Sequence, residues 1–229
     1  MPWRLRDLGL AAASVLAASV FTLIVLGSVL AFLGDTGSDV EMAGLLTAAL
    51  VVDVAFVAAA GWFGVRRYSC GWRALGFRPP VRGGWWVPLA VVLAAYVALG
   101  VYFTIVELAG LGKLVPQSTL EDAFDNWALL PLVGVLAIVA APIAEETFFR
   151  GFLFPGLRSR WGTLWAALVS SLLFASLHFD LGSIIPFTVI GMLFVWAYVF
   201  SGSLWTSIVA HFAFNSISFL LAVATGGGS

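Results

Sequence analysis

Six ionisable residues interrupt long apolar runs of the sequence, where charged side chains are rare. They are Asp53, Glu145, Glu146, Arg150, His178 and His211. A charge at the centre of a bilayer costs about 2.5–3.5 kcal/mol even on a mild insertion scale, so such residues mark functional sites. His178 and His211 are the only two histidines of the chain. Five of the six residues fall on three apolar runs of the carboxyl-terminal half, which predicts one buried polar site.

The Glu-Glu-Thr-Phe-Phe-Arg stretch at 145–150 supplies two carboxylates in different surroundings. Glu146 and Arg150 are four residues apart, so they share a helix face and can form an ion pair. Glu145 lies about 100° further round the helix and cannot pair with Arg150 equally well. Pro142 has no N–H to donate, and we expect it to bend the helix before the two acids and to open a backbone carbonyl there. The sequence therefore predicts one neutralised carboxylate and one that can accept a proton.

Counting residues from the predicted helix ends gives the depth of each group. Relative to a turn at 158–162, Glu145 and His178 differ in depth by only about 3 Å on adjacent antiparallel helices. Relative to the turn at 201–203, His211 lies nearer the cytoplasmic face. We expect Glu145 and His178 to be level with each other.

His211 and Asn215 are four residues apart and share one helix face. A carboxylate and an imidazole that converge on one water form a general base, while a second imidazole and a carboxamide can donate hydrogen bonds to a developing oxyanion. This set suits hydrolysis of a peptide bond within the membrane. In the alternative, these residues have only a structural role. The histidines and Asn215 then pack and join helices through hydrogen bonds, and the Glu146–Arg150 ion pair joins helices as well.

The same side chains leave a metal site open. Glu145, His178 and His211 form a His/His/Glu set, which together with a water is a catalytic zinc set. The helical H-E-x-x-H arrangement is absent from the sequence, so the ligands would have to come from three separate helices.

The composition is that of a membrane protein. The 229 residues are 62% hydrophobic and 10% charged, whereas a soluble domain is about a quarter charged. The 11 basic and 12 acidic residues exclude a nucleic-acid-binding surface, and the single cysteine, Cys70, excludes an internal disulfide. Seven continuous apolar runs predict helices rather than barrel strands. They span residues 8–33, 43–65, 85–109, 128–157, 163–178, 184–200 and 204–223.

These runs predict an all-α, polytopic membrane bundle of about seven transmembrane helices. We expect a single integral-membrane domain over 1–229, with the catalytic core over about 128–223. The loop arginines fall into three groups, namely Arg4 and Arg6, then Arg66, Arg67, Arg73, Arg78 and Arg82, then Arg158 and Arg160. The alternate loops carry acidic residues, among them Asp35 and those at 121–125. The positive-inside rule therefore places the arginine loops and the amino terminus in the cytoplasm.

Three motifs on separate predicted helices resemble the CPBP family of intramembrane endopeptidases, which includes the CAAX-processing, bacteriocin-processing, Abi and Rce1-like proteins. They are E-E-x-x-x-R at 145–150, F-x-x-x-H at 174–178 and H-x-x-x-N at 211–215. Their order and spacing match the family over about 128–215. The best-known members of the family have eight helices, so the resemblance makes an eighth helix possible.

The resemblance also implies a role for each site residue. Glu145 and His178 would activate a water, His211 and Asn215 would form the oxyanion hole, and Glu146 and Arg150 would orient and brace the site. It implies hydrolysis of the glutamate type, so no cofactor is expected, with zinc as the alternative.

The sequence and the resemblance together predict an intramembrane endopeptidase that cleaves a membrane-associated or hydrophobic peptide or protein. Ten arginines against one lysine suggest a prokaryote, and we expect the protein in its plasma membrane. One alternative is a catalytically silent family member that acts as a membrane scaffold or an immunity or regulatory partner. Another is a proton-coupled transporter that uses Asp53, Glu145 and His178 as a relay. The lack of repeat symmetry disfavours the transporter.

Overall fold

The computed structural model describes residues 1–34, 37–116 and 128–226, and every regular element in this part of the chain is a helix. The longer ones are α1 (Leu5–Leu33), α2 (Gly37–Ala60), α3 (Trp86–Leu108), α5 (Leu130–Val135), α6 (Ala141–Glu146), α7 (Phe154–Ser176), α8 (Leu181–Ser201) and α9 (Leu204–Gly226). Short π-helical segments are η1 (Gly61–Val65), η5 (Leu136–Ala140) and η6 (Thr147–Leu153), and short 3₁₀ turns are η2 (Arg66–Tyr68), η3 (Trp72–Leu75) and η4 (Gly112–Leu114). Asp35 and the acidic residues at 121–125, which support the predicted topology, lie outside the described residues.

Six helical segments of the described chain are long and apolar enough to cross a membrane. The fourth, Leu130–Ser176, has 47 residues and contains Gly162 in a non-helical conformation (φ 73°, ψ 176°) that favours glycine. The rings of Phe149 and Phe174 are 5.6 Å apart, whereas a straight helix would separate them by about 37 Å. The chain therefore turns back at Gly162, and this segment supplies two of the seven predicted passes. The prediction of an all-α, multi-pass membrane bundle is confirmed.

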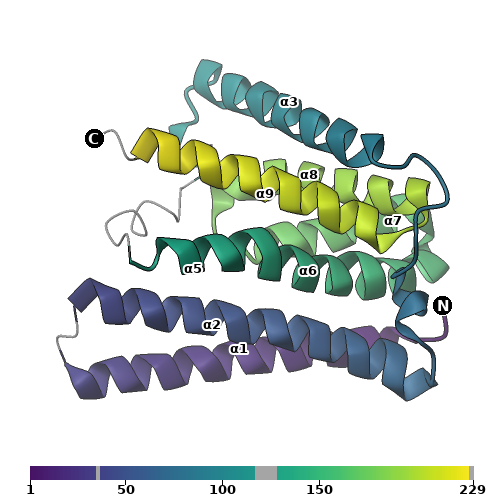
Figure 1. The fold of residues 1–229 in the computed structure, drawn as a ribbon, viewed down its shortest axis with the longest axis horizontal. Helices are drawn as coiled ribbons and strands as arrows, with labels where there is room; N and C mark the ends of the chain where they lie inside the picture. The colour runs from purple at the N-terminus through teal and green to yellow at the C-terminus, as the bar shows by residue number, and fades with distance from the viewer. Residues whose placement is uncertain (35–36, 117–127, 227–229) are drawn as a thin grey trace.

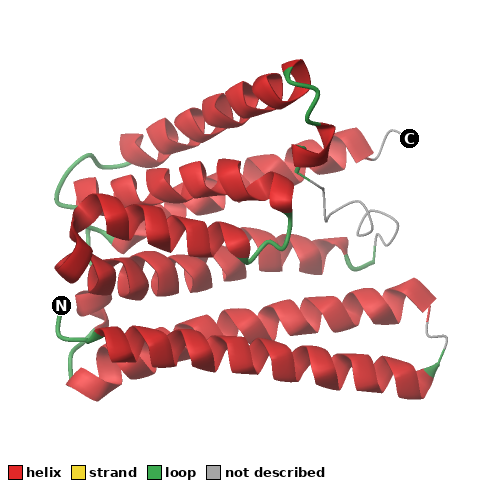
Figure 2. Ribbon diagram, turned by 180° about the vertical axis from the view of Figure 1, so that it is seen from behind, coloured by secondary structure: helices red, strands yellow, loops and turns green. Residues whose placement is uncertain are grey.

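The helices that carry the predicted site lie in the middle of the bundle. In Figure 1, α1 and α2 form a pair along one edge and α3 lies at the opposite edge. Between these edges α6 packs against α2 and α9, and α8 packs against α3, α7 and α9. The view from behind in Figure 2 shows the same arrangement of helices, with the amino terminus and the end of α9 at opposite ends of the bundle.

Two clusters of buried apolar side chains hold this arrangement. The larger one surrounds η6 and includes Phe148, Phe149 and Phe152, and it extends to Trp3, whose indole N–H donates to the carbonyl of Phe152 (3.0 Å). The second lies between α3, α8 and α9 and includes Phe194. Large apolar side chains also cover the outside of the bundle, as expected for a surface that faces lipid.

The two acids of the predicted site lie on α6, a short α-helical segment between two π-helical ones. The predicted disturbance before the acids is present, because Pro142 lies in the first turn of α6, directly after η5. Each π-helical turn adds a residue, which rotates the side chains that follow by about 100°.

The helix predicted over 163–178 ends two residues earlier, at Ser176. His178 lies in the turn before α8, where its backbone N–H donates to the carbonyl of Ala175 (3.2 Å) instead of continuing the α-helical pattern. Phe179 follows with a φ of 52°, which reverses the chain.

Candidate active site

Glu146 is the centre of a fully buried polar cluster. Its carboxylate accepts a hydrogen bond from Nη1 of Arg150 (2.8 Å), one turn further along the helix, so the predicted ion pair is present. It also accepts a hydrogen bond from the hydroxyl of Ser207 and lies 3.1 Å from Nδ1 of His211. Both Glu146 and Arg150 have no exposed surface. A buried ion pair is most stable when its remaining donors and acceptors are satisfied, and here α9 supplies two partners for Glu146. Nε of Arg150 is buried without a hydrogen-bond partner among the described residues.

Arg150 is enclosed by aromatic rings and by a close contact with α8. Its Cζ atom lies 4.4 Å from the ring centroid of Phe174, 5.3 Å from that of Phe194 and 5.9 Å from that of Phe149. Its Nη2 donates to the carbonyl of Gly191 (3.2 Å). A Cβ atom at Gly191 would lie 2.8 Å from Cβ of Ser171 and 3.0 Å from Nη2 of Arg150, so α8 approaches this closely because glycine stands there.

Glu145 has a much less crowded carboxylate. Its side chain retains 19% of its surface exposed, and the described residues give it no hydrogen bond. Its nearest ionisable partner is His211, whose Nε2 lies 3.7 Å from Oε2 of Glu145. Asp53 of α2, which is half-buried, is close enough to Glu145 for their charges to interact. The predicted difference between a neutralised Glu146 and a Glu145 without a local cation is therefore present.

His211 bridges the two acids. Nδ1 of its imidazole faces Glu146 and Nε2 faces Glu145, while the ring stacks on Phe194 with centroids 4.7 Å apart. The residue count that placed His211 nearer the cytoplasmic face is wrong, because the structure puts it level with both glutamates. The π-helical segment η6 contributes to the error, since it lies between Glu145 and the turn at 158–162 and a count at 1.5 Å per residue assumes a regular α-helix there.

His178 lies beside the cluster and not within it. Its Nδ1 is 3.3 Å from the carbonyl of Phe174, and its ring packs edge-on against Phe187 with centroids 4.5 Å apart. The ring of Phe174 contacts both imidazoles, at 5.2 Å from His178 and 5.9 Å from His211. No hydrogen bond or ion pair joins His178 to Glu145 directly in the described chain, so their expected convergence on one water stays a prediction.

Asn215 replaces a hydrogen bond that Pro142 cannot make. Its amide Nδ2 donates to the carbonyl of Ala137 (2.7 Å) within the π-helical segment η5. In a π-helix this carbonyl would accept from the N–H five residues later, and that residue is Pro142, which has none. As predicted, a backbone carbonyl near Pro142 is left without its helical partner. Asn215 of α9 donates to this carbonyl in place of the missing N–H.

Comparison with known proteins identifies the segment that holds these residues. A family model described as "Type II CAAX prenyl endopeptidase Rce1-like" matches residues 127–217, which include all three motifs. Residues 127–217 are thus similar to the Rce1-like family. The resemblance to the CPBP family is therefore confirmed.

Two curated proteins are similar to parts of this chain. "Putative membrane peptidase YdiL" of Bacillus subtilis (strain 168) is 29% identical over 107 residues, which cover 47% of this chain and 43% of the relative. An "Uncharacterized protein" of Mycoplasma capricolum subsp. capricolum is 30% identical over 153 residues, which cover 61% of this chain and 45% of the relative. The chain thus spans less than half the length of the relatives it matches. No solved structure matches it significantly.

The Rce1-like segment contains three site residues that the sequence reasoning missed. Ser207 bonds to Glu146, Phe194 stacks on His211, and Gly191 admits the guanidinium of Arg150. Ser207 had a signal in the sequence, because it precedes His211 by four residues as Asn215 follows it by four. Nothing in the sequence distinguishes Phe194 from the other phenylalanines of the apolar runs.

The possible zinc ligands of the Rce1-like segment are not assembled as a ligand set. Within the described residues no group of three or more His, Cys, Asp or Glu side chains is arranged to hold a metal ion. Glu145 and His211 are close, but both ring nitrogens of His211 already face carboxylates, and His178 contacts neither of these two residues. The residues as placed here do not fit a zinc ion.

Proposed function

We propose that this chain is an intramembrane endopeptidase that hydrolyses a peptide bond of a membrane-associated or hydrophobic peptide or protein. The observation that carries the proposal is the pair of adjacent acids with opposite surroundings. Arg150 and Ser207 fully engage Glu146, whereas Glu145 keeps a carboxylate without a hydrogen bond beside the imidazole of His211. A carboxylate in this position can take a proton from water.

In the proposed reaction, Glu145 accepts a proton from a water molecule, and the resulting hydroxide attacks the carbonyl carbon of the scissile bond. The negative charge that develops on the carbonyl oxygen is stabilised by donors from α9, namely the amide of Asn215 and Nε2 of His211. Nε2 donates when the ring is protonated on both nitrogens, because Nδ1 already faces the carboxylate of Glu146. The proton held by Glu145 then passes to the leaving amine as the C–N bond breaks. One N–H of Asn215 is already used by Ala137, so the second is the one available to the oxyanion.

We assign His178 to the same water as Glu145. A proton on Nδ1 of His178 would be donated to the carbonyl of Phe174, which leaves Nε2 free to accept a hydrogen bond from water. Because the ring of Phe174 contacts both imidazoles, the proposal requires this ring to shift when water and substrate enter. The expected substrate and the bilayer are the partners, with no nucleic acid, and the expected location is the plasma membrane of a prokaryote with the amino terminus in the cytoplasm.

A second candidate is a catalytically silent family member that binds another membrane protein as a scaffold or as an immunity or regulatory partner. Two observations favour it. His178 does not reach Glu145 in the described chain, and the amide of Asn215 serves the backbone of η5. Both would be expected of polar residues that only join helices.

A comparison of membranes that contain the wild-type protein or its variants decides between the two candidates. We expect Glu145→Ala and His178→Ala to insert and purify normally and to leave the same set of peptides uncut in a proteomic comparison. Glu107→Ala is the matched control, because Glu107 is an exposed carboxylate near the end of α3. If both site variants keep the full biological activity of the protein, the scaffold is correct and the endopeptidase is not.

A further inference from the structure

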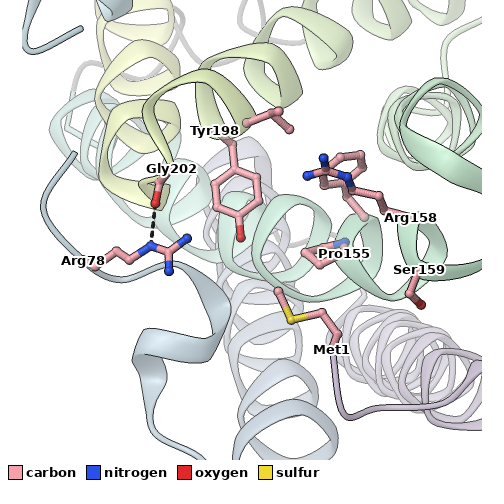
Figure 3. A pocket seen from close by; sticks show the side chains of 9 residues that line it. Met1, Arg78, Pro155, Arg158, Ser159, Tyr198 and Gly202 are labelled. Carbon is pink, nitrogen blue, oxygen red and sulfur yellow. Dashed lines mark hydrogen bonds between the residues drawn. The ribbon is translucent and has the colours of Figure 1, made fainter. Parts of the chain in front are cut away.

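A pocket of about 370 Å³ opens at the end of the bundle where the loop arginines gather (Figure 3). Two arginines from distant parts of the chain, Arg78 and Arg158, line it, and no acidic side chain does. Neither arginine forms an ion pair with any carboxylate of the described chain. Two unpaired guanidinium groups at one pocket repel each other, so the pocket is electrostatically suited to an anion.

Arg78 is fixed in place by hydrogen bonds between its loop and the turn that joins α8 to α9. Its Nε donates to the carbonyl of Gly202 (2.6 Å), which Figure 3 shows as a dashed line. The hydroxyl of Ser203 donates to the carbonyl of Arg78, and the N–H of Leu204 donates to that of Gly76 (2.8 Å). The two terminal nitrogens of Arg78 have no partner in the described part of the chain. A held guanidinium group with free terminal nitrogens is prepared to bind an anion in a bidentate way.

Tyr198 adds a hydroxyl donor from the wall of the pocket. The residue is only 6% exposed, and its hydroxyl points into the space between Arg78 and Pro155 in Figure 3. Gly76 has a φ of 99°, and a Cβ atom there would lie 2.5 Å from the ring of Tyr198 and 3.0 Å from its hydroxyl oxygen. The ring is thus held against the backbone of the loop, and its hydroxyl has no hydrogen-bond partner among the described residues.

The surroundings place the pocket at the surface of the membrane. The exposed tryptophans Trp161 and Trp205 follow Arg158 and Gly202 by three residues each, and exposed tryptophans are enriched where lipid headgroups begin. At this end of the described bundle the carboxylate of Asp7 is already paired with Arg67 (3.2 Å). Nothing nearby therefore neutralises the two pocket arginines.

We propose that this pocket binds the phosphate group of an anionic phospholipid. The two guanidinium groups neutralise the phosphate, and the hydroxyl of Tyr198 donates a further hydrogen bond to it. The buried ring of Phe154 lies 5.9 Å from Cζ of Arg158 and supports that guanidinium group from within the protein. Basic pockets between transmembrane helices are a known means of binding lipid headgroups. The proposal does not depend on proteolysis, because binding is measured on the resting protein.

Native mass spectrometry of the detergent-solubilised protein tests the proposal, with phosphatidylglycerol, phosphatidylcholine and inorganic phosphate as probes. We expect one molecule of phosphatidylglycerol to bind in preference to phosphatidylcholine. Loss of a charge-assisted hydrogen bond weakens binding by roughly tenfold, which is the effect expected for Arg158→Gln. Tyr198→Phe is expected to weaken binding by a few-fold, because it removes the hydroxyl and keeps the ring. Arg160→Gln is the matched control, since Arg160 is exposed and lies two residues beyond Arg158.

Arg78→Gln tests the other guanidinium group, and Arg158→Gln remains decisive if the loss of the Arg78 bonds prevents folding. The lipid proposal is overturned if Arg158→Gln and Arg160→Gln bind phosphatidylglycerol equally well. It is also overturned if phosphatidylcholine binds as tightly as phosphatidylglycerol. Saturation of the pocket by inorganic phosphate without any preference for phosphatidylglycerol would assign the pocket to a free anion instead.

Discussion

Nε2 of His211 lies 3.7 Å from the carboxylate of Glu145, while the other nitrogen of the same ring faces Glu146. One imidazole is therefore shared by two carboxylates, of which only Glu146 has a cation as a direct partner. Three of the six predicted site residues, Glu145, Glu146 and His211, meet at this point, and Arg150 forms an ion pair with Glu146. The predictions below concern the residues that hold this contact in place.

Arg150→Ala is expected to destabilise the protein by about 3–5 kcal/mol, because it leaves the fully buried carboxylate of Glu146 without its cation. Thermal unfolding in detergent measures this loss. The double variant Arg150→Ala with Glu146→Gln should recover part of it, because glutamine removes the orphaned charge. Arg160→Ala, at an exposed arginine, serves as the control. An Arg150→Ala variant as stable as Arg160→Ala would show that the ion pair does not stabilise the fold.

Gly191→Ala is expected to destabilise the protein by about 1–3 kcal/mol, because the added methyl group overlaps Ser171 and Arg150. The same substitution at Gly100 of α3 is the control, since a Cβ atom there meets nothing within 4 Å. Gly100→Ala should be neutral or slightly stabilising. Unfolding midpoints of the two variants in a denaturing detergent make the comparison. Equal midpoints would mean that the close approach of α8 to Arg150 is not required.

Ser207→Ala is expected to cost about 1–3 kcal/mol, because it removes one hydrogen bond from the buried carboxylate of Glu146. The matched control is Ser216→Ala on the same helix, where the hydroxyl bonds only to the carbonyl of Phe212 (2.7 Å). Both substitutions remove one oxygen atom from α9, so the difference in thermal stability reports the contacts of the Ser207 hydroxyl with Glu146 and, at 3.3 Å, with the carbonyl of Phe194. A Ser216→Ala variant that loses as much stability as Ser207→Ala would refute this role of Ser207.

We expect the purified protein to contain zinc far below one ion per chain and to keep its activity after treatment with a chelator. The reason is the placement of the possible ligands, since both nitrogens of His211 face carboxylates and His178 stands apart from Glu145. Elemental analysis and an activity assay on the same sample test this expectation. Stoichiometric zinc that is lost together with activity would replace the proposed water activation by Glu145 with a metal-based one.

Local spacing in the sequence predicted the parts of the site that lie on one helix. The pair Glu146 and Arg150 and the pair His211 and Asn215 each depend on a spacing of four residues, which any α-helix brings to one face. The apolar runs likewise predicted the passes of the chain, because a segment in lipid must satisfy its own backbone. The reversal at Gly162 lies within the predicted turn at 158–162.

Relations between helices were harder to predict. The depth count placed His211 nearer the cytoplasmic face than Glu145, but the structure brings Nε2 of His211 within 3.7 Å of the carboxylate of Glu145. A count assumes a constant rise, whereas the segments on both sides of α6 are π-helical and His178 lies beyond the end of α7. Phe174 contacts both imidazoles because helices that are distant in the sequence pack against each other, and no local spacing in the sequence predicts such packing.

The reversal at Gly162 also determines the parity of the fold. With a turn there, the described helices make an odd number of passes, and the first residues and the end of α9 lie at opposite ends of the bundle (Figure 1). A single straight helix over the same 47 residues would make the number even and bring both to the same side of the bilayer. One glycine thus decides in which compartment a reporter fused after α9 would be found.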